Sequence, residues 1–165
     1  MEVMSKWYLI KLCYTLPLCY YIQLPLIFLP AFIARKTLLD PMLYATEGTL
    51  MALRIASQMK WAINLSGGYH HASFNRGGGF CIYPDISLAV HYLKTRMNIQ
   101  RIMIIDCDAH QGNGYERDCI GDEGVYIVDL YNHRIYPRDT KAKKAIAKDI
   151  SIGPYTTDEQ YISLL

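Results

Sequence analysis

The chain has 165 residues, enough for one domain of ordinary size, and its net charge of +2 is too small for nucleic-acid binding by overall electrostatic attraction. Hydrophobic residues make up 52% of the sequence, which is the composition of a globular protein. The five cysteines are irregularly spaced and form no CxxC pair, which argues against a thiolate zinc site or a disulfide framework and indicates a reducing compartment.

An apolar stretch without any charged residue runs from Leu12 to Ala34. It is long enough to span a membrane, and a signal peptide is a second interpretation. Against these stand Pro17, Pro25 and Pro30, which would break a helix repeatedly, and the lack of a clean small-residue cleavage site after the stretch. We favour buried strand and loop from an α/β core and keep a membrane span as an open alternative.

A first helix is predicted from Asp40 to about Met59. Asp40 followed by Pro41 is typical of a helix cap and a first-turn proline, although Thr46 is a competing start. Apolar contacts are expected from one group of side chains in this helix, namely Leu50, Met51, Leu53 and Ile55.

A short strand is predicted next, over residues 61–65, and it leads into a glycine-rich loop at residues 67–79. Pro84 then opens a second helix. The apolar residues that follow this proline recur at helical spacing along one face, namely Ile86, Ala89, Val90, Leu93 and Met97.

Two buried strands are predicted after the second helix. Residues 101–105 are nearly all apolar after Arg101, which is typical of a fully buried strand, and residues 125–128 form another. Between them, Asn113 is a candidate cap of a short helix, with Glu116 three residues later. This alternation predicts a parallel sheet covered by helices, with polar residues at the carboxyl edge where ligands bind.

The acidic motif at residues 106–110 is the sharpest chemical signal. Burying carboxylates at the end of an apolar strand is costly unless they are paired or bind a metal. Because residues two apart in an extended segment point the same way, Asp108 and His110 can share one cation, with Asp106 forming a hydrogen bond behind them. The alternative interpretation is a loop of polar caps that follows a strand.

Two adjacent histidines, His70 and His71, form the second signal. They follow a predicted strand and a glycine turn, so both can face one pocket, and one of them could act as general base on a metal-bound water. A histidine pair alone is usually a surface accident, but its occurrence together with the acidic motif favours a shared site.

These segments resemble the histone deacetylase family in order and spacing. The resemblance is carried by residues 68–72 (GYHHA), 76–81 (RGGGFC) and 105–114 (IDCDAHQGNG). It covers roughly residues 22 to 162, so we expect an unmatched apolar segment at 1–20 and a partial histone deacetylase catalytic domain at 21–165.

Other segments look like the class IV branch of that family. They include Gln111 and Asn113, residues 128–132 (VDLYN) and residues 135–137 (IYP). Residues 25–30 (PLIFLP) look like the early strand and loop of that branch, and this match weakens the membrane interpretation.

The resemblance implies an α/β fold similar to that of arginases and deacetylases, a three-layer structure whose parallel sheet has helices on both faces, incomplete in this chain. It also implies that Asp108 and His110 are two of three protein ligands to a catalytic zinc. His71 would be the general base and later the acid. His70, with Asp106 as its partner, would help to hold the water and the acyl oxygen.

Further residues receive roles from the same resemblance. Asn113 would orient His71, and because a neutral amide stabilises an imidazolium less than a carboxylate does, we expect a less basic His71 than in members with aspartate there. Gly79 and Phe80, with Tyr136 opposite, would wall the tunnel for the acyl-lysine stem. Backbone carbonyls would suit a structural potassium ion near Asp106, Asp108, His110 and Leu130.

The implied function is zinc-dependent hydrolysis of acyl-lysine amides, that is, lysine deacylation in chromatin regulation. Zinc both polarises the carbonyl and lowers the pKa of a bound water to about 7. Histones would be among the protein substrates and corepressors among the partners, without direct binding to nucleic acid or membrane. The expected location is the nucleus, with the cytoplasm as a second one.

The chain departs from the family pattern because it stops at Leu165, before the third zinc ligand and the tyrosine that stabilises the oxyanion. Asp122, Asp129 and His133 are the only nearby spare ligands, and nothing in their placement recommends them. We therefore expect these 165 residues to be inactive alone, with an unpaired sheet edge and an exposed apolar face. The alternatives are a non-catalytic interaction module and an arginase-like manganese hydrolase.

Overall fold

The computed structural model of the protein describes residues 31–164. The segment expected at residues 1–20, the early strand and loop at 25–30 and most of the apolar stretch before Ala34 lie outside the described residues. Among the described helices, none is long and apolar enough to cross a membrane. In chain order the elements are α3 (Ala31–Ala34), the π-helix η1 (Arg35–Leu39), α4 (Asp40–Met59), α5 (Asp85–Arg96), β1 (Ile102–Asp106), α6 (Asn113–Asp118), β2 (Val125–Asn132), the 3-10 helix η2 (Ala142–Ala145), β3 (Ile146–Ile152) and α7 (Asp158–Leu164).

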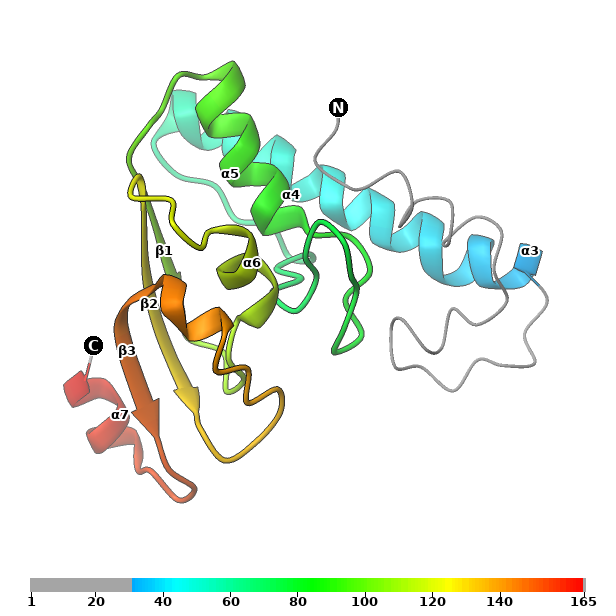
Figure 1. Cartoon of the computed structure of the whole chain (residues 1–165). Helices are drawn as coiled ribbons and strands as arrows, with labels where there is room; N and C mark the ends of the chain where they lie inside the picture. Colours follow the sequence, from blue (N-terminus) through cyan, green and yellow to red (C-terminus); the bar gives the residue numbers. More distant parts are fainter. Residues whose placement is uncertain (1–30, 165) are drawn as a thin grey trace.

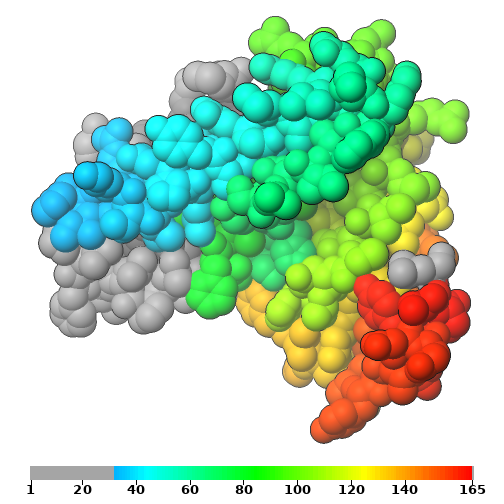
Figure 2. Space-filling view, turned by 180° about the vertical axis from the view of Figure 1, so that it is seen from behind, coloured from blue at the N-terminus to red at the C-terminus, as the bar shows by residue number. Residues whose placement is uncertain are grey.

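The described sheet has three parallel strands in the order β1–β2–β3 (Figure 1). Ile104 pairs with Ile127, and the register is irregular between Ile127 and Val128. Helices α5, α6 and η2 lie on one face, whereas α7 lies on the other, toward the viewer in Figure 2. The prediction of a parallel sheet with helices on both faces is confirmed.

A compact apolar cluster joins the first of these faces to its helices. Val125 and Ile127 of β2 pack with Tyr115 of α6, with Cys119 directly after that helix and with Val90 of α5. The side chains predicted to form one face of the second helix are buried or half-buried, and that helix begins right after Pro84 as expected. The sequence pattern therefore correctly identified how this side of the sheet is covered.

The first helix begins earlier than the sequence predicted. Asp40 has helical backbone angles (φ −64°, ψ −47°), so it lies inside a continuous helix that starts at Ala31 rather than capping it. The Asp40 N–H bonds to the Arg35 carbonyl in the π-helical turn just before Pro41. Because a proline has no N–H to donate, a widened turn before it lets the helix continue. The predicted end at Met59 is confirmed by the left-handed Lys60 that follows (φ 74°).

Several apolar side chains that the sequence places in contacts or buried strands are exposed instead. Residues 61–65 form no strand among the described elements, and Leu65 is 98% exposed. On β1 the outward side chains Met103 and Ile105 are exposed, so this strand is covered on one face only by the described residues. Met51 and Ile55 also point to solvent. Hydrophobicity alone predicted burial here, but burial requires a covering element, and none of the described segments covers these positions. Met103 and Ile105 form the exposed apolar sheet face that was also expected.

Candidate active site

The two predicted motifs meet beside the carboxyl end of β1. This strand ends at Asp106, and the loop after it carries Asp108 and His110, while the glycine-rich loop after α4 carries His70 and His71. The rings of His70 and His71 have centroids 4.1 Å apart, and the His71 and His110 rings lie 5.8 Å apart. Tertiary structure therefore brings the histidine pair and the acidic motif into one site.

Asp85 holds the histidine loop in place, a role that the sequence analysis missed. This fully buried carboxylate accepts hydrogen bonds from the backbone N–H groups of Gly68 (2.7 Å) and Tyr69 (2.8 Å) and from the Thr49 hydroxyl (2.7 Å). Gly67 has a φ of +92°, and a Cβ there would lie 2.7 Å from an Asp85 carboxylate oxygen. The only signal in the sequence was an acid in the first turn of a helix whose other face is apolar.

Asp106 accepts two hydrogen bonds at one carboxylate oxygen. Its Oδ2 lies 2.9 Å from His70 Nδ1 and 2.9 Å from the Tyr115 hydroxyl, while Oδ1 accepts the Asp108 N–H at 3.0 Å. Burial acts to lower the pKa of His70, but the hydrogen bond and charge of Asp106 outweigh it, so that the pKa is raised. The sequence predicted the His70–Asp106 pair, whereas Tyr115 was not anticipated.

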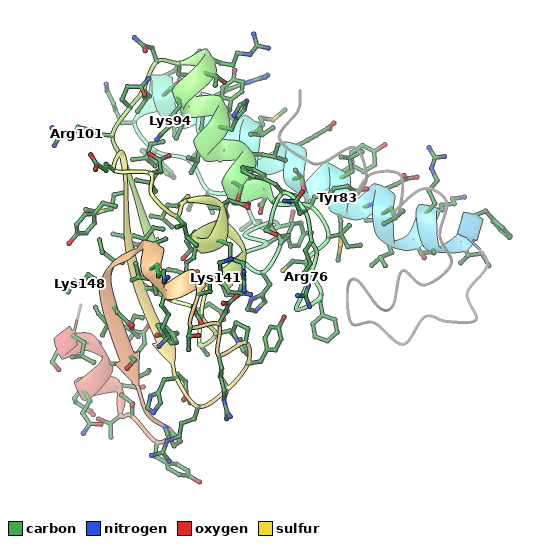
Figure 3. The ribbon with its side chains drawn as sticks, viewed as in Figure 1. Arg76, Tyr83, Lys94, Arg101, Lys141 and Lys148 are labelled. Atoms are coloured by element: carbon green, nitrogen blue, oxygen red, sulfur yellow. The ribbon has the colours of Figure 1, made fainter. Side chains whose placement is uncertain are left out.

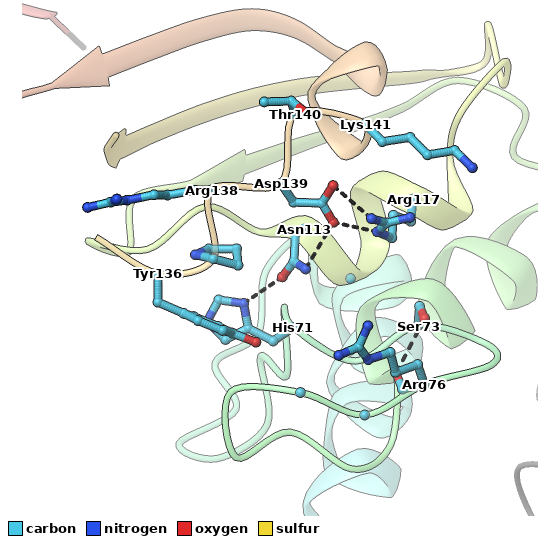
Figure 4. Close-up of a pocket in the computed structure, with 14 residues that line it drawn as sticks. His71, Ser73, Arg76, Asn113, Arg117, Tyr136, Arg138, Asp139, Thr140 and Lys141 are labelled. Carbon is cyan, nitrogen blue, oxygen red and sulfur yellow. Dashed lines mark hydrogen bonds and ion pairs between the residues drawn. The ribbon is translucent and has the colours of Figure 1, made fainter. Parts of the chain in front are cut away.

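His71 is held in one tautomer by Asn113. Its Nδ1 lies 2.8 Å from Asn113 Oδ1, and the Asn113 amide nitrogen donates to Asp139 Oδ2 at 3.3 Å (Figure 4). Since an amide oxygen only accepts, His71 Nδ1 carries the proton and Nε2 keeps a lone pair. Burial, followed by the neighbouring His70, lowers the pKa of His71 to about 4. The hydrogen bond to Asn113 acts in the opposite direction and raises this pKa. That His71 is less basic than in members with aspartate at this position stays a prediction.

The capping box predicted for the helix after the acidic motif is wrong. Gly112 is the N-cap of α6, and no side chain caps the helix. The Asn113 side chain is bonded to His71, and the buried Glu116 carboxyl group accepts from Gln111 Nε2 at 2.6 Å. Burial raises the pKa of Glu116 to about 9. Both side chains thus serve the site instead of the helix terminus.

Asp108 and His110 form the second half of the site. His110 Nδ1 lies 3.0 Å from Asp108 Oδ1, and His70 Nε2 lies 3.7 Å from the same oxygen. A carboxylate and an imidazole are ligands that zinc accepts, and catalytic zinc sites have three protein ligands. Within residues 31–164, however, no group of three His, Cys, Asp or Glu side chains is arranged to hold a metal. The pair thus fits two of the three positions.

The spare ligands near the motif have other partners. Asp122 pairs with Lys94, and His133 Nδ1 faces the Ile152 carbonyl at 2.8 Å. Asp129 is fully buried and accepts the Gly112 N–H at 2.9 Å. None of these three completes the pair formed by Asp108 and His110.

The predicted tunnel residues lie around His71. The ring of Tyr136 stands edge-on to that of His71, with centroids 4.9 Å apart. Gly79 approaches from another side, because a Cβ there would lie only 2.1 Å from His71 Cδ2. Phe80 follows with its ring largely exposed. Gly79 and Tyr136 therefore enclose the imidazole, and Phe80 lies at the surface.

Comparisons with known proteins give one family. Residues 29–165 match the histone deacetylase domain. The chain is 44% identical over 141 residues to histone deacetylase 2 of Arabidopsis thaliana, a match that covers 86% of this chain and 36% of the relative. It is 33% identical over 124 residues to the acetoin utilization protein AcuC of Staphylococcus aureus (strain COL), covering 69% of this chain and 31% of that protein.

Solved structures agree with these sequence matches. A histone deacetylase homologue complexed with SAHA superposes with a TM-score of 0.57 at 26% identity, covering 66% of this chain and 31% of that one. An acetylpolyamine aminohydrolase from Burkholderia pseudomallei has the same fold, with a TM-score of 0.60 at 18% identity over 73% of this chain and 38% of its own. The chain spans about a third of the length of these relatives.

Proposed function

Because the chain belongs to the histone deacetylase domain family, we propose that it supplies the acid–base half of a zinc-dependent lysine deacylase site of class IV type. The observation that carries this proposal is the pair of differently supported histidines. His70 is bonded to a carboxylate, and His71 is bonded to a neutral amide. Two adjacent imidazoles with opposed pKa shifts can divide proton transfer between them.

In the proposed reaction, His71 Nε2 takes a proton from the attacking water and later delivers it to the departing lysine amine. His70 keeps Nδ1 toward Asp106, which leaves its Nε2 to hold the water and the acyl oxygen. Asp108 and His110 would hold zinc with a third ligand. Zinc supplies a Lewis acid for the acyl carbonyl and the water.

The class IV assignment is supported by Gln111 and Asn113. Gln111 accepts the Asp139 N–H at 2.9 Å and donates to the Asp139 carbonyl at 3.0 Å, while Asn113 donates to the carboxylate of the same residue. These hydrogen bonds of Gln111 and Asn113 join the loop that carries Asp108 and His110 to the segment after Tyr136. A structural potassium ion is also proposed, on backbone carbonyls near Asp106, Asp108, His110 and Leu130.

The proposed substrates are acyl-lysine side chains of proteins such as histones. Gly79, Phe80 and Tyr136 would line the path of the lysine stem, because two of them enclose His71. Corepressor proteins as partners, and a nuclear location with the cytoplasm as a second one, belong to the same proposal for the whole protein.

A non-catalytic role is the second candidate for the 165-residue chain itself. It is favoured by the described donor set, in which only Asp108 and His110 converge as potential metal ligands. Such a chain could compete with a complete deacetylase for partners. This role and the deacylase function are separated by the following assay.

The test uses a chimera in which residues 29–165 replace the matching segment of the Arabidopsis relative. We expect the chimera to release acetate or a long-chain fatty acid from acyl-lysine peptides, His71→Ala to abolish the release, and Lys148→Gln to leave it unchanged. The 165-residue chain alone should be inactive. An inactive but folded chimera would contradict the deacylase proposal and leave the non-catalytic one.

A further inference from the structure

A cavity of about 470 Å³ opens beside His71, between the glycine-rich loop and the segment after Tyr136 (Figure 4). Four cationic side chains line it, and Asp139 is the only carboxylate among its lining residues. Three positive charges are thus left without a matching negative charge in the cavity wall. The four cations are Arg76, Arg117, Arg138 and Lys141.

Three of these cations have no acidic partner in the part of the chain that the structure describes. Neither Arg76 nor Lys141 forms an ion pair within residues 31–164, and both side chains are exposed. Arg138 instead donates to the Arg134 carbonyl and points away from the others in Figure 4. Arg76 and Lys141 are therefore available to an incoming anion.

Arg117 lies between Arg76 and Lys141 in Figure 4, and only some of the N–H groups of its guanidinium are already hydrogen-bonded. It donates through Nε and through Nη2 (2.8 Å) to the Asp139 carboxylate, which is 10% exposed and also accepts the Ala142 N–H at 3.1 Å. A guanidinium has five N–H donors, so three remain for another acceptor. Asp139 fixes the orientation of Arg117 without neutralising the whole cavity.

The cavity is continuous with the proposed catalytic site. His71 and Tyr136, whose rings lie 4.9 Å apart, belong to its wall. A molecule whose acyl-lysine reaches His71 would therefore place its neighbouring groups over the cavity. Guanidinium groups favour the planar, bidentate geometry of carboxylates and phosphates.

We propose that this cavity is a subsite for an acidic side chain, carboxylate or phosphate, that flanks the acyl-lysine of a protein substrate. The proposal rests on the proposed deacylase function, because that function places the substrate at His71. Arg76 and Arg117 would bind the anion, and Lys141 would attract it. The subsite selects acyl-lysines by the charge of their sequence neighbours, independently of the acyl group.

The test measures binding of fluorescent peptides to the 165-residue chain by anisotropy at low salt. Two acetyl-lysine peptides differ only in flanking glutamates or glutamines, and a third glutamate peptide has an unmodified lysine. We expect the glutamate peptide to bind about tenfold more tightly than the glutamine peptide, as for a hydrogen bond to a charged group. Arg76→Gln should remove most of this ratio, and Lys141→Gln part of it. The matched control Lys148→Gln, on β3 and outside the cavity, should leave it unchanged.

Each outcome has a defined meaning. Equal binding of the two acetylated peptides, or a ratio that survives Arg76→Gln, would overturn the subsite. If inorganic phosphate binds in an Arg76-dependent way while the two peptides bind equally, the cavity takes a free anion and not a substrate side chain, which also overturns the proposal. If acetylated and unmodified peptides bind equally, the acetyl group does not contribute to binding by this chain. The deacylase function is then decided by the chimera assay, and the glutamate-to-glutamine ratio still judges the cavity.

Discussion

The two halves of the candidate site differ in how much support this chain gives them. The His70 side chain is 11% exposed and is bonded to Asp106, which is equally buried. Asp108 and His110 have side chains that are 51% and 44% exposed, and they contact chiefly each other. Figure 3 shows the side chains of α5, α6 and β1, the elements next to His70 and Asp106.

This difference indicates that the acid–base half is preorganised by the described residues, whereas the metal half is not. The histidine loop is held by buried hydrogen bonds to Asp85, Asp106 and Asn113. Asp108 and His110 lie on a solvent-exposed loop, where an ion pair between two side chains contributes little to the free energy of unfolding. Substitutions around His70 and His71 should therefore lower the free energy of unfolding far more than substitutions at Asp108 and His110.

The largest effect is expected from Asp85→Ala. This change leaves the buried N–H groups of Gly68 and Tyr69 and the Thr49 hydroxyl without their acceptor. We expect the free energy of unfolding to fall by about 3 to 5 kcal/mol, measured by urea denaturation of the chain. Asp158→Ala, in the exposed first turn of α7, is the control with little effect. A similar loss in both variants would mean that the histidine loop is not preorganised by Asp85.

Tyr115→Phe should have the next largest effect. It retains the fully buried ring and removes only the hydroxyl that donates to Asp106 Oδ2. A hydrogen bond to a charged group contributes about 1.5 to 3 kcal/mol, and we expect a loss in that range. Tyr92→Phe, whose hydroxyl accepts only from the exposed Arg54, is the matched control. Equal stability of Tyr115→Phe and the parent chain would show that His70 is oriented without this tyrosine.

Asn113→Asp tests the electrostatic side of the comparison. The pKa of His71 is about 4 in the folded chain, against an ordinary value of 6.5, so unfolding takes up a proton between these pH values. Stability should therefore fall as the pH drops from 6.5 to 4, by up to about 1.4 kcal/mol per pH unit. A carboxylate next to His71 should raise the pKa of His71 by about one unit. The lower limit of the pH range over which stability falls should rise by the same amount.

Denaturation across this pH range, with an NMR titration of the His71 ring, measures both quantities for Asn113→Asp. Asn98→Asp, on the exposed turn after α5, controls for the added charge. An unmoved His71 titration in the Asn113 variant would show that burial and His70 set the basicity of this histidine, whatever group faces its Nδ1.

The smallest effect on stability is expected from Asp108→Asn. Because half of this side chain is exposed, the free energy of unfolding should change by less than about 0.5 kcal/mol. In the chimera with the Arabidopsis relative, binding of Zn²⁺ or Co²⁺, measured by calorimetry or cobalt absorption, should nevertheless be lost, while His91→Asn on the exposed part of α5 keeps it. A large loss of stability would refute the contrast between the two halves.

Local sequence patterns predicted the elements that depend on neighbouring residues. The apolar spacing after Pro84 identified α5, the apolar run before Asp106 identified β1, and the predicted end of the first helix at Met59 is confirmed. The failures share a cause. The start at Asp40, the strand at residues 61–65 and the burial of Met103 all depended on how distant segments cover or continue the element.

By itself, the sequence determined which chemical groups are present and in what order: a histidine pair, then an acidic motif at the end of an apolar strand. The resemblance to a known family named the partners of His70 and His71, and only the tertiary structure decided the others. Asp85 lies 17 residues from Gly68, whose N–H it accepts, and Asp106 lies 9 residues from Tyr115. Such contacts have no periodic signal along the chain, because they arise where separate elements pack together. The same packing gathers Arg76, Arg117 and Lys141 around one cavity.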